Sequence, residues 1–235
     1  MPRGSPKIKK DTDRSLFGFR MNKSRMDPPA PPTTKGQRTR AEIIRRSARL
    51  MNRQGFLAAP LTAVIDETGI QKGGLYRHFE SREALAYAAF DHAVAAVRDR
   101  FLAAIQGHAH ACDQLLAMLA TYGQDSDAST VPFEGGCPIM NAAIESDHAH
   151  PGLRQRAHDA MLAWHGLLAR IVAGGIRRGE IRENIEADVE AGVVIACLEG
   201  AVMLSHLHGS VQPLRAALQH LAQHVERDLR AGPAS

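Results

Sequence analysis

The stretch LTAVIDETGIQKGGLYRHF holds two short apolar-patterned segments on either side of one glycine. Apolar residues three and four apart predict a helix over 60–68, which Gly69 ends. A second helix is expected over 71–79, with Leu75 and Phe79 four residues apart on its inward face. Two short helices across a tight turn form a helix-turn-helix, whose second helix enters the major groove of DNA. This stretch therefore constrains the chain more than any other.

Two adjacent glycines, Gly73 and Gly74, lie near the start of the second helix. A glycine in a helix interior costs about 1 kcal/mol relative to alanine, so the pair is expected to serve something other than helix strength. Glycine leaves room for the backbone and for helix N-terminal amides to approach phosphate. The pair therefore predicts close approach to a large partner such as DNA.

Charge is divided unevenly along the chain, although the net charge is only +4. Nine Lys/Arg face three Asp/Glu in residues 1–35, and nine face four in residues 36–82. Residues 83–235 hold eleven Lys/Arg and eighteen Asp/Glu. A basic N-terminal third and an acidic remainder predict a polyanion bound by the first part and a different ligand bound by the second.

Composition indicates a protein of the reducing cell interior. The 235 residues are 44% hydrophobic and 23% charged, which suits one large or two small globular domains. Three scattered cysteines favour a reduced compartment over a disulfide framework. The N-terminus lacks the apolar segment of a signal peptide, and Glu199 interrupts the most apolar run, AGVVIACLEGAVMLSHL. We expect a cytoplasmic protein with no membrane partner.

Residues 1–35 end in PPAPPTTK and show no apolar period. This composition predicts a disordered, basic, Pro-rich extension. The extension is either an arm that reaches DNA or an unused segment upstream of a start at Met21 or Met26.

Ordered structure is expected to begin near Thr34, whose hydroxyl caps a helix over 36–54 that Gly55 ends. An inward apolar stripe on this helix is formed by Ile44, Ala48 and Met51. A second face carries arginines, namely Arg38, Arg45, Arg49 and Arg53. Residues 36–82 are therefore expected to form a three-helix, helix-turn-helix DNA-binding domain.

The rest of the chain, residues 83–235, shows helical patterns and no convincing strand. Ser81 is expected to cap a long helix that runs to about Gln106. Further helices are expected over 112–122, 138–147, 151–178, 186–208 and 212–230. The predicted fold is all-α, with the helix-turn-helix head followed by a helical-bundle domain for ligand binding and dimerisation.

The segment from about 37 to 90 resembles the TetR family of bacterial transcriptional repressors. LTAVIDETGIQKGGLYRHFESREAL matches the family's order of helix, Gly-apolar turn, Lys-Gly, Leu-Tyr, His-Phe, and a Lys/Arg-Glu-x-Leu entry into a long fourth helix. The resemblance implies a homodimer that represses transcription from a palindromic double-stranded DNA operator and releases it on binding a small-molecule effector. The implied DNA contacts are Gln71, Lys72, Gly73, Gly74, Tyr76, Arg77, His78 and Arg82.

The chain departs from the family pattern at both short helices. Gln71 occupies a position where a capping Ser or Thr is usual, Gly74 replaces a commonly hydroxylated residue, and Ala59 and Pro60 replace a usual threonine cap. Alternative roles also stay open for three of the expected contacts. The Tyr76 ring packs against the first helix or meets DNA, Arg77 binds phosphate or a guanine edge, and His78 packs inside or enters the groove.

The resemblance implies that the last two helices form the dimer interface. Small residues four apart on the helix over 186–208 leave one face that a partner helix can approach closely, although packing within the chain would use the same face. The expected interface residues are Val189, Gly192, Val193, Ala196, Gly200 and Met203.

By resemblance, the effector site lies among the helices over 82–178. Methionines and aromatic side chains there can line an adaptable apolar pocket with one or two polar anchors, although ordinary core packing explains each one singly. The candidate residues are Met118, Tyr122, Phe133, Cys137, Met140, Met161, Trp164 and His165.

Alternative regulators of the same fold would sense thiol chemistry or a metal. Cys137 follows two glycines and precedes Pro138 at an expected helix start, a place that lowers a thiol pKa. Glu145 and His148 form one Glu-x-x-His, and His220 and His224 lie four apart. A helical metal-dependent oxidase is the remote alternative, because di-iron bundles need two such motifs. We expect no enzyme activity, no cofactor and no resident metal.

Overall fold

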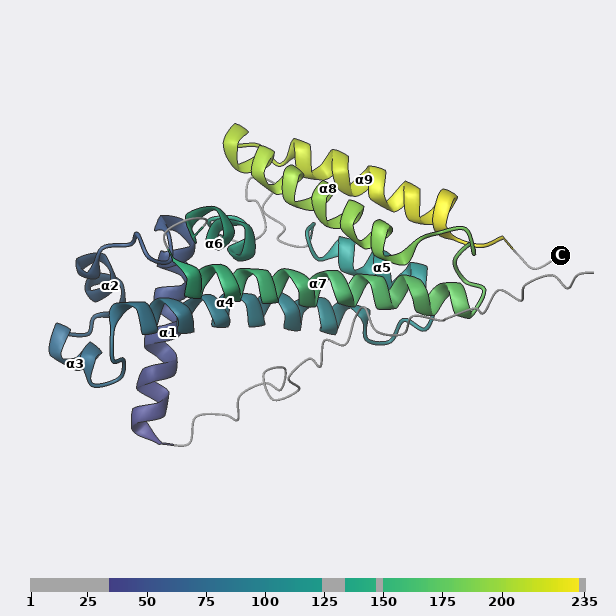
Figure 1. Ribbon diagram of the computed structural model, residues 1–235. Helices are drawn as coiled ribbons and strands as arrows, with labels where there is room; N and C mark the ends of the chain where they lie inside the picture. The colour runs from purple at the N-terminus through teal and green to yellow at the C-terminus, as the bar shows by residue number, and fades with distance from the viewer. Residues whose placement is uncertain (1–33, 124–133, 147–149, 233–235) are drawn as a thin grey trace, which may run out of the picture. The chain divides into compact units, whose positions relative to one another are not determined.

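The computed structural model describes residues 34–123, 134–146 and 150–232. Within these ranges the chain is all-α, and its only pairing of extended backbone is an isolated bridge between Ile181 and Arg230. The elements in order are α1 (Lys35–Gln54), α2 (Leu61–Thr68), α3 (Lys72–Tyr76), α4 (Arg82–Ile105), α5 (Ala111–Ala120), α6 (Pro138–Ser146), α7 (Pro151–Arg177), α8 (Ala187–His208), α9 (Gln212–His224) and a π-helical turn (Val225–Leu229) (Figure 1). All but the last two residues of the expected N-terminal extension lie outside the described residues.

Two helix starts follow the expected capping chemistry. Thr34 Oγ1 accepts from Gln37 N at 3.2 Å, and Gln37 Oε1 accepts from Thr34 N at 2.9 Å, which completes a capping box on α1. Ser81 Oγ accepts from Ala84 N at 3.0 Å and caps α4. Both local sequences therefore fix where the flanking helices begin.

The recognition element α3 is shorter than the sequence predicts. The helix was expected to reach Phe79 but ends at Tyr76. A tighter turn continues it, because the N–H groups of His78 and Phe79 both donate to Leu75 O, at 3.0 and 3.1 Å. This turn still brings Leu75 and Phe79 into the core, where they are 1% and 4% exposed.

One hydrophobic core joins the helix-turn-helix (the head, α1–α3) to the helices that follow it (the body, α4–α9). It holds Met51 of α1, Val64 of α2 and Leu75 of α3, together with residues of α4, α6 and α7. Phe56 packs edge-on against Phe90 of α4, with ring centroids 5.3 Å apart. Figure 1 shows α1 against the first turns of α4. The head is therefore packed on the elements that follow it.

A second core fills the space between α4, α5, α7, α8 and α9. Its aromatic members form a stack in which Phe101 of α4 lies between Tyr122 and Trp164, at centroid distances of 5.7 and 5.9 Å. α8 packs on both α7 and α9, and α9 covers it on one side (Figure 1). No helix in the described part of the chain is long and apolar enough to cross a membrane.

The last helix differs from the single segment expected over 212–230. α9 ends at His224, and residues 225–229 form a π-helical turn in which Arg230 N donates to Val225 O at 3.0 Å. Val225 and Leu229, at the two ends of this turn, are both buried in the core. Apolar periodicity alone could not predict this turn.

Candidate nucleic-acid interface

The exposed side of α3 carries most of the expected DNA contacts. Leu75 and Phe79 fix the segment in the core, and the exposed side chains are those of Gln71, Lys72, Tyr76 and Arg77. The Tyr76 side chain keeps 43% exposure, so its ring is not packed inside the protein. A lysine, an arginine and an aromatic ring on one short exposed element suit contacts to phosphates and base edges.

The two glycines of α3 have different surroundings. A Cβ at Gly73 would meet no atom within 4 Å, whereas a Cβ at Gly74 would lie 2.9 Å from Ile70 Cγ1. Gly74 therefore has a reason inside the protein, because it lets Ile70 pack under the turn. No contact inside the protein requires a glycine at position 73, so the hypothesis that the backbone approaches DNA closely now rests on Gly73 alone.

His78 and Arg82 lie differently from the other expected contacts. The His78 side chain is half-buried at the end of the turn. Arg82 Nη2 donates to Leu57 O at 2.6 Å and also to Ala59 O. These bonds hold the guanidinium against loop carbonyls that have no helical partner. Arg82 therefore positions the loop between α1 and α2, and its expected phosphate contact stays a prediction.

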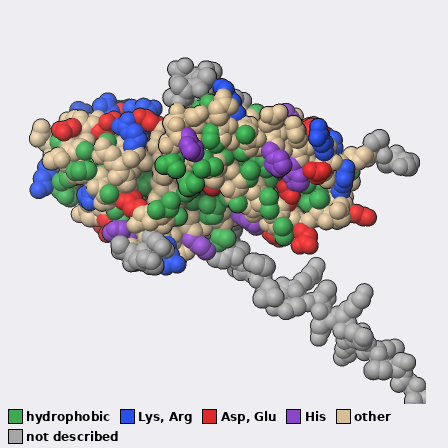
Figure 2. Space-filling model, turned by 90° about the horizontal axis from the view of Figure 1, so that it is seen from above, with side chains coloured by type: hydrophobic (Ala, Val, Ile, Leu, Met, Phe, Trp, Pro, Cys, Tyr) green, Lys and Arg blue, Asp and Glu red, His purple; other side chains and the backbone are tan. Residues whose placement is uncertain are grey.

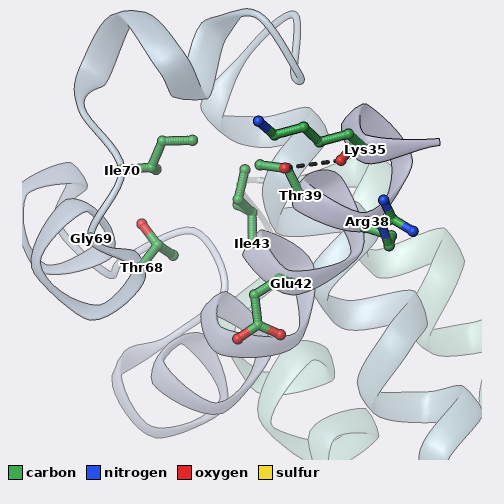
Figure 3. Close-up of a pocket in the computed structure, with 8 residues that line it drawn as sticks. All are labelled: Lys35, Arg38, Thr39, Glu42, Ile43, Thr68, Gly69 and Ile70. Carbon is green, nitrogen blue, oxygen red and sulfur yellow. Dashed lines mark hydrogen bonds between the residues drawn. The ribbon is translucent and has the colours of Figure 1, made fainter. Parts of the chain in front are cut away.

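A shallow hollow of about 520 Å³ lies between the first turns of α1 and the turn that joins α2 to α3 (Figure 3). The lining residues are Lys35, Arg38, Thr39, Glu42, Ile43, Thr68, Gly69 and Ile70. Hydrogen bonds from Arg45 and Arg46 lower the pKa of Glu42 to about 2 and pair its charge on α1 itself. Glu42 is therefore already paired, and Lys35 and Arg38 are the basic side chains that line this hollow.

Glu145, near the end of α6, binds the loop between α1 and α2 from the body side. Its Oε2 accepts from Phe56 N at 2.6 Å, and its Oε1 accepts from Leu57 N at 2.8 Å and Ala58 N at 2.7 Å. Gly55 permits this approach, since it has a φ of 96° and a Cβ there would lie 2.8 Å from Glu145 Oε1. The loop is held by Glu145 through its N–H groups and by Arg82 through its carbonyls.

A second set of polar contacts joins the segment before α6 to the end of α1. Asn52 Nδ2 donates to Glu134 O at 2.8 Å and Gly136 O at 2.9 Å, and Asn141 Nδ2 donates to Asn52 O at 3.1 Å. Gly135 has a φ of 91°, and a Cβ there would lie 2.7 Å from Asn52 O. Together with the Glu145 contacts, these bonds attach both ends of α6 to the head around a hollow of about 290 Å³.

The expected effector residues are mostly core residues, and Phe133 lies outside the described residues. Met118, Tyr122 and Trp164 are buried in the second core, and Met140 and Met161 pack against it half-exposed. His165 contacts a different part of the chain, because its Nε2 lies 3.0 Å from Asp188 O at the start of α8. Neither of the two hollows described above is lined by any residue of this set.

The pKa expected for Cys137 is reversed. Its position before Pro138 predicts a lowered pKa, but the side chain is only 7% exposed and burial raises the thiol pKa. Desolvation of the thiolate outweighs the helix N-terminus here. Thiol sensing by Cys137 therefore loses its chemical basis.

The histidine and carboxylate pairs expected to suit a metal are used otherwise. Glu145 binds the three N–H groups described above, and His148 lies outside the described residues. The two ring nitrogens of His224 contact different carboxylates, with Nδ1 2.9 Å from Asp228 Oδ2 and Nε2 3.1 Å from Glu190 Oε1. Among the residues that the structure describes, no three His, Cys, Asp or Glu side chains gather in a group that could hold a metal.

The outward side of α8 carries the residues expected at the dimer interface. Val189, Val193 and Met203 are 59%, 53% and 46% exposed, and a Cβ at Gly192 or Gly200 would meet no atom within 4 Å. Ala196 is also exposed. Figure 2, seen from the side on which α8 and α9 lie, shows hydrophobic side chains gathered on this face. Packing within the described chain therefore does not use this face.

Two family models match the chain. The first, described as bacterial regulatory proteins of the tetR family, matches residues 43–89, which include the helix-turn-helix. The second, described as the tetracyclin repressor-like C-terminal domain, matches residues 111–221. The matches cover both the head and the helical body.

Solved structures and curated proteins give the same result. A TetR transcriptional regulator from Chloroflexus aurantiacus J-10-FL is 41% identical, with a TM-score of 0.77 over 84% of this chain and 99% of that chain. A TetR-family regulator from Cytophaga hutchinsonii is 30% identical, with a TM-score of 0.77 over 85% and 98%. The HTH-type transcriptional regulator LmrA of Bacillus subtilis is 27% identical over 75% of this chain and 90% of its own length. The match to the A-factor receptor protein of Streptomyces griseus, 22% identical, covers 78% of this chain and 60% of that protein.

Proposed function

Because the chain belongs to the TetR family of DNA-binding transcriptional regulators, we propose that it is a homodimeric repressor that a small-molecule effector releases from a palindromic operator. The observation that carries the proposal is the pairing of two exposed surfaces on one chain. One is the basic exposed side of α3, and the other is the apolar outward side of α8.

DNA contact is assigned to the exposed side of α3. Lys72 and Arg77 bind phosphates, which supplies affinity without sequence preference, and Tyr76 lies between them on the same exposed element. Gln71 and Gly73 lie at the start of α3, where the backbone can approach the DNA closely. Lys35 and Arg38 extend this basic surface along α1.

Dimerisation is assigned to the outward side of α8. Val189, Val193 and Met203 supply apolar area, and Gly192 and Gly200 let a partner helix come close. A two-fold dimer carries two α3 elements related by the same symmetry, so the operator is palindromic with half-sites about one helical turn apart.

Effector release is assigned to movement of α6. Its N-terminal end is bound to Asn52 of the head, and Glu145 near its other end binds the α1–α2 loop. An effector that displaces α6 therefore moves the head, and an effector that binds only the displaced state shifts the dimer away from DNA. A transcriptional regulator from Saccharomonospora viridis, 21% identical with a TM-score of 0.69, was solved with choline bound, so at least one protein of this fold holds a small molecule.

The dimer assignment is tested by sedimentation equilibrium of the wild type and of Val193→Asp. We expect the wild type at twice the 25.5 kDa chain mass and Val193→Asp near the chain mass, because a buried unpaired carboxylate disrupts an apolar interface. Leu102→Asp, which changes a 39% exposed leucine on α4, is the matched control and stays dimeric. A monomeric wild type, or a dimeric Val193→Asp, contradicts the assignment.

A further inference from the structure

Glu199 is a carboxylate inside the apolar part of α8. The residue as a whole is half-buried, its Oε2 is buried and has no hydrogen-bond partner, and the Cys137 thiol lies near enough to lower its pKa. Burial raises the pKa of Glu199, the thiol lowers it, and no cation of the described residues contributes to the shift. Burying a carboxylate without a cationic partner costs several kcal/mol, so stability alone does not explain this residue.

A second unpartnered polar group lies in the same core. The Trp164 side chain is 7% exposed, and its indole Nε1 is buried without a hydrogen-bond partner. Its ring begins the stack that continues through Phe101 to Tyr122. The pKa of Tyr122 is raised by burial and by Cys137 and Glu199 and lowered by Arg100, so Glu199 and Arg100 both act on this end of the stack.

We propose that Glu199 and the two outer rings of the aromatic stack, Trp164 and Tyr122, anchor the effector, and that the effector is a small organic cation. The cation supplies the counter-charge that the Glu199 carboxylate lacks, and aromatic ring faces attract cations. Trp164 Nε1 offers a donor to an acceptor on the same molecule. Met140 and Met161, which pack half-exposed against this core, are flexible side chains that can move to admit the ligand.

This inference rests on the proposed function, and the geometry connects the anchor to the head. Cys137, whose thiol lowers the pKa of Glu199, immediately precedes α6. A cation at Glu199 competes with that thiol for the carboxylate and so releases the start of α6. The far part of α6 carries Glu145, which holds the α1–α2 loop. Binding at Glu199 is therefore expected to loosen the head.

The chain has a single tryptophan, so intrinsic fluorescence reports directly on Trp164. The full-length protein is titrated with choline, tetraethylammonium and benzyltriethylammonium, and with 3,3-dimethylbutan-1-ol, the uncharged isostere of choline. We expect a saturable fluorescence change with at least one cation, and at least about tenfold weaker binding of the uncharged isostere than of choline if choline is that cation.

Glu199→Gln keeps the shape of the side chain and removes its charge. We expect it to weaken binding of the cation at least about tenfold and to leave weak binding of the uncharged alcohol unchanged. Without ligand, its thermal unfolding midpoint should equal or exceed that of the wild type, because a buried amide costs less than a buried carboxylate. Glu183→Gln, at an exposed glutamate between α7 and α8, is the matched control and binds like the wild type.

Four outcomes decide the proposal. Cation-selective binding that Glu199→Gln abolishes supports it. No fluorescence change with any of the three cations overturns it, as does cation binding that Glu199→Gln leaves intact. A duplex-DNA competition separates it from the proposed function: if the cation binds at Glu199 but leaves DNA affinity unchanged, the site stands and effector release by this ligand fails.

Discussion

Removing the Glu145 carboxylate should loosen the α1–α2 loop and destabilise the protein. Glu145→Ala leaves three N–H groups, those of Phe56, Leu57 and Ala58, without their acceptor. A hydrogen bond to a charged group contributes about 1.5–3 kcal/mol, and water can replace the acceptor at Ala58, which is exposed. The bond to buried Phe56 should be lost in full and the bond to half-buried Leu57 about half, which gives an expected loss of about 2–4 kcal/mol. Glu145→Gln keeps one carbonyl oxygen for Leu57 and Ala58 and should lose about half as much.

Two measurements test this loss. Thermal unfolding followed by circular dichroism, at one protein concentration, should show a midpoint lowered by about 5–10 °C in Glu145→Ala. Hydrogen–deuterium exchange should be faster in residues 55–60 of the same variant, because their acceptor is gone. Glu183→Ala, which removes an exposed carboxylate elsewhere, is the control and should change neither quantity.

The result that would refute this reasoning is a Glu145→Ala variant that unfolds and exchanges like Glu183→Ala. In that case the three short contacts would contribute no net stability, and the loop would be held by Arg82 and packing alone. The same result would leave the contacts of Asn52 and Asn141 to connect α6 with the head.

Three further perturbations have defined outcomes. Lys72→Ala should weaken binding to all duplexes nearly equally and lower the slope of log affinity against log salt by about 1, and equal affinity with the wild type would remove its phosphate contact. Gly73→Ala should raise the thermal unfolding midpoint, because alanine favours a helix over glycine and the added Cβ meets open space. The same variant should bind DNA more weakly in anisotropy titrations. Unchanged DNA affinity would contradict close approach of the α3 backbone to DNA. Burial lowers the pKa of His224, but hydrogen bonds to Asp228 and Glu190 outweigh burial and raise the pKa. The stability that these bonds contribute is therefore complete below pH about 6.5, and it is lost as the pH rises through the folded-state pKa. In urea titrations, His224→Gln should therefore cost more stability at pH 5.5 than at pH 8.5, and an equal cost at both would refute the pairing.

Local chemistry made the fold predictable. The Thr34 and Ser81 caps, the glycine that ends α2 and the buried pair Leu75 and Phe79 are all set by residues within four positions of one another. The outward stripe of α8 was also visible, because small and apolar residues recur there at helical spacing. Such features depend on one helix and its ends, which periodicity and capping rules describe.

Long-range polar contacts were not predictable from the sequence. In the sequence, Glu145 stands out only as half of a possible metal pair, and its acceptor role depends on a loop 87 to 89 residues earlier in the chain. Arg82 fits a DNA-contact pattern in sequence, yet its guanidinium is used by loop carbonyls. The sequence predicts a helix start directly after Cys137, which the structure confirms, but it does not show that neighbouring helices bury this cysteine.

The most direct test of the proposed function is selection of bound sequences from a random duplex pool with purified full-length protein at near-physiological salt. We predict enrichment of a palindrome whose half-sites lie about one helical turn apart, with Lys72→Ala retaining the preference at lower affinity. Binding that shows only salt-sensitive background without enrichment, or an enriched site without two-fold symmetry, would contradict a homodimeric regulator that reads its operator through two copies of α3.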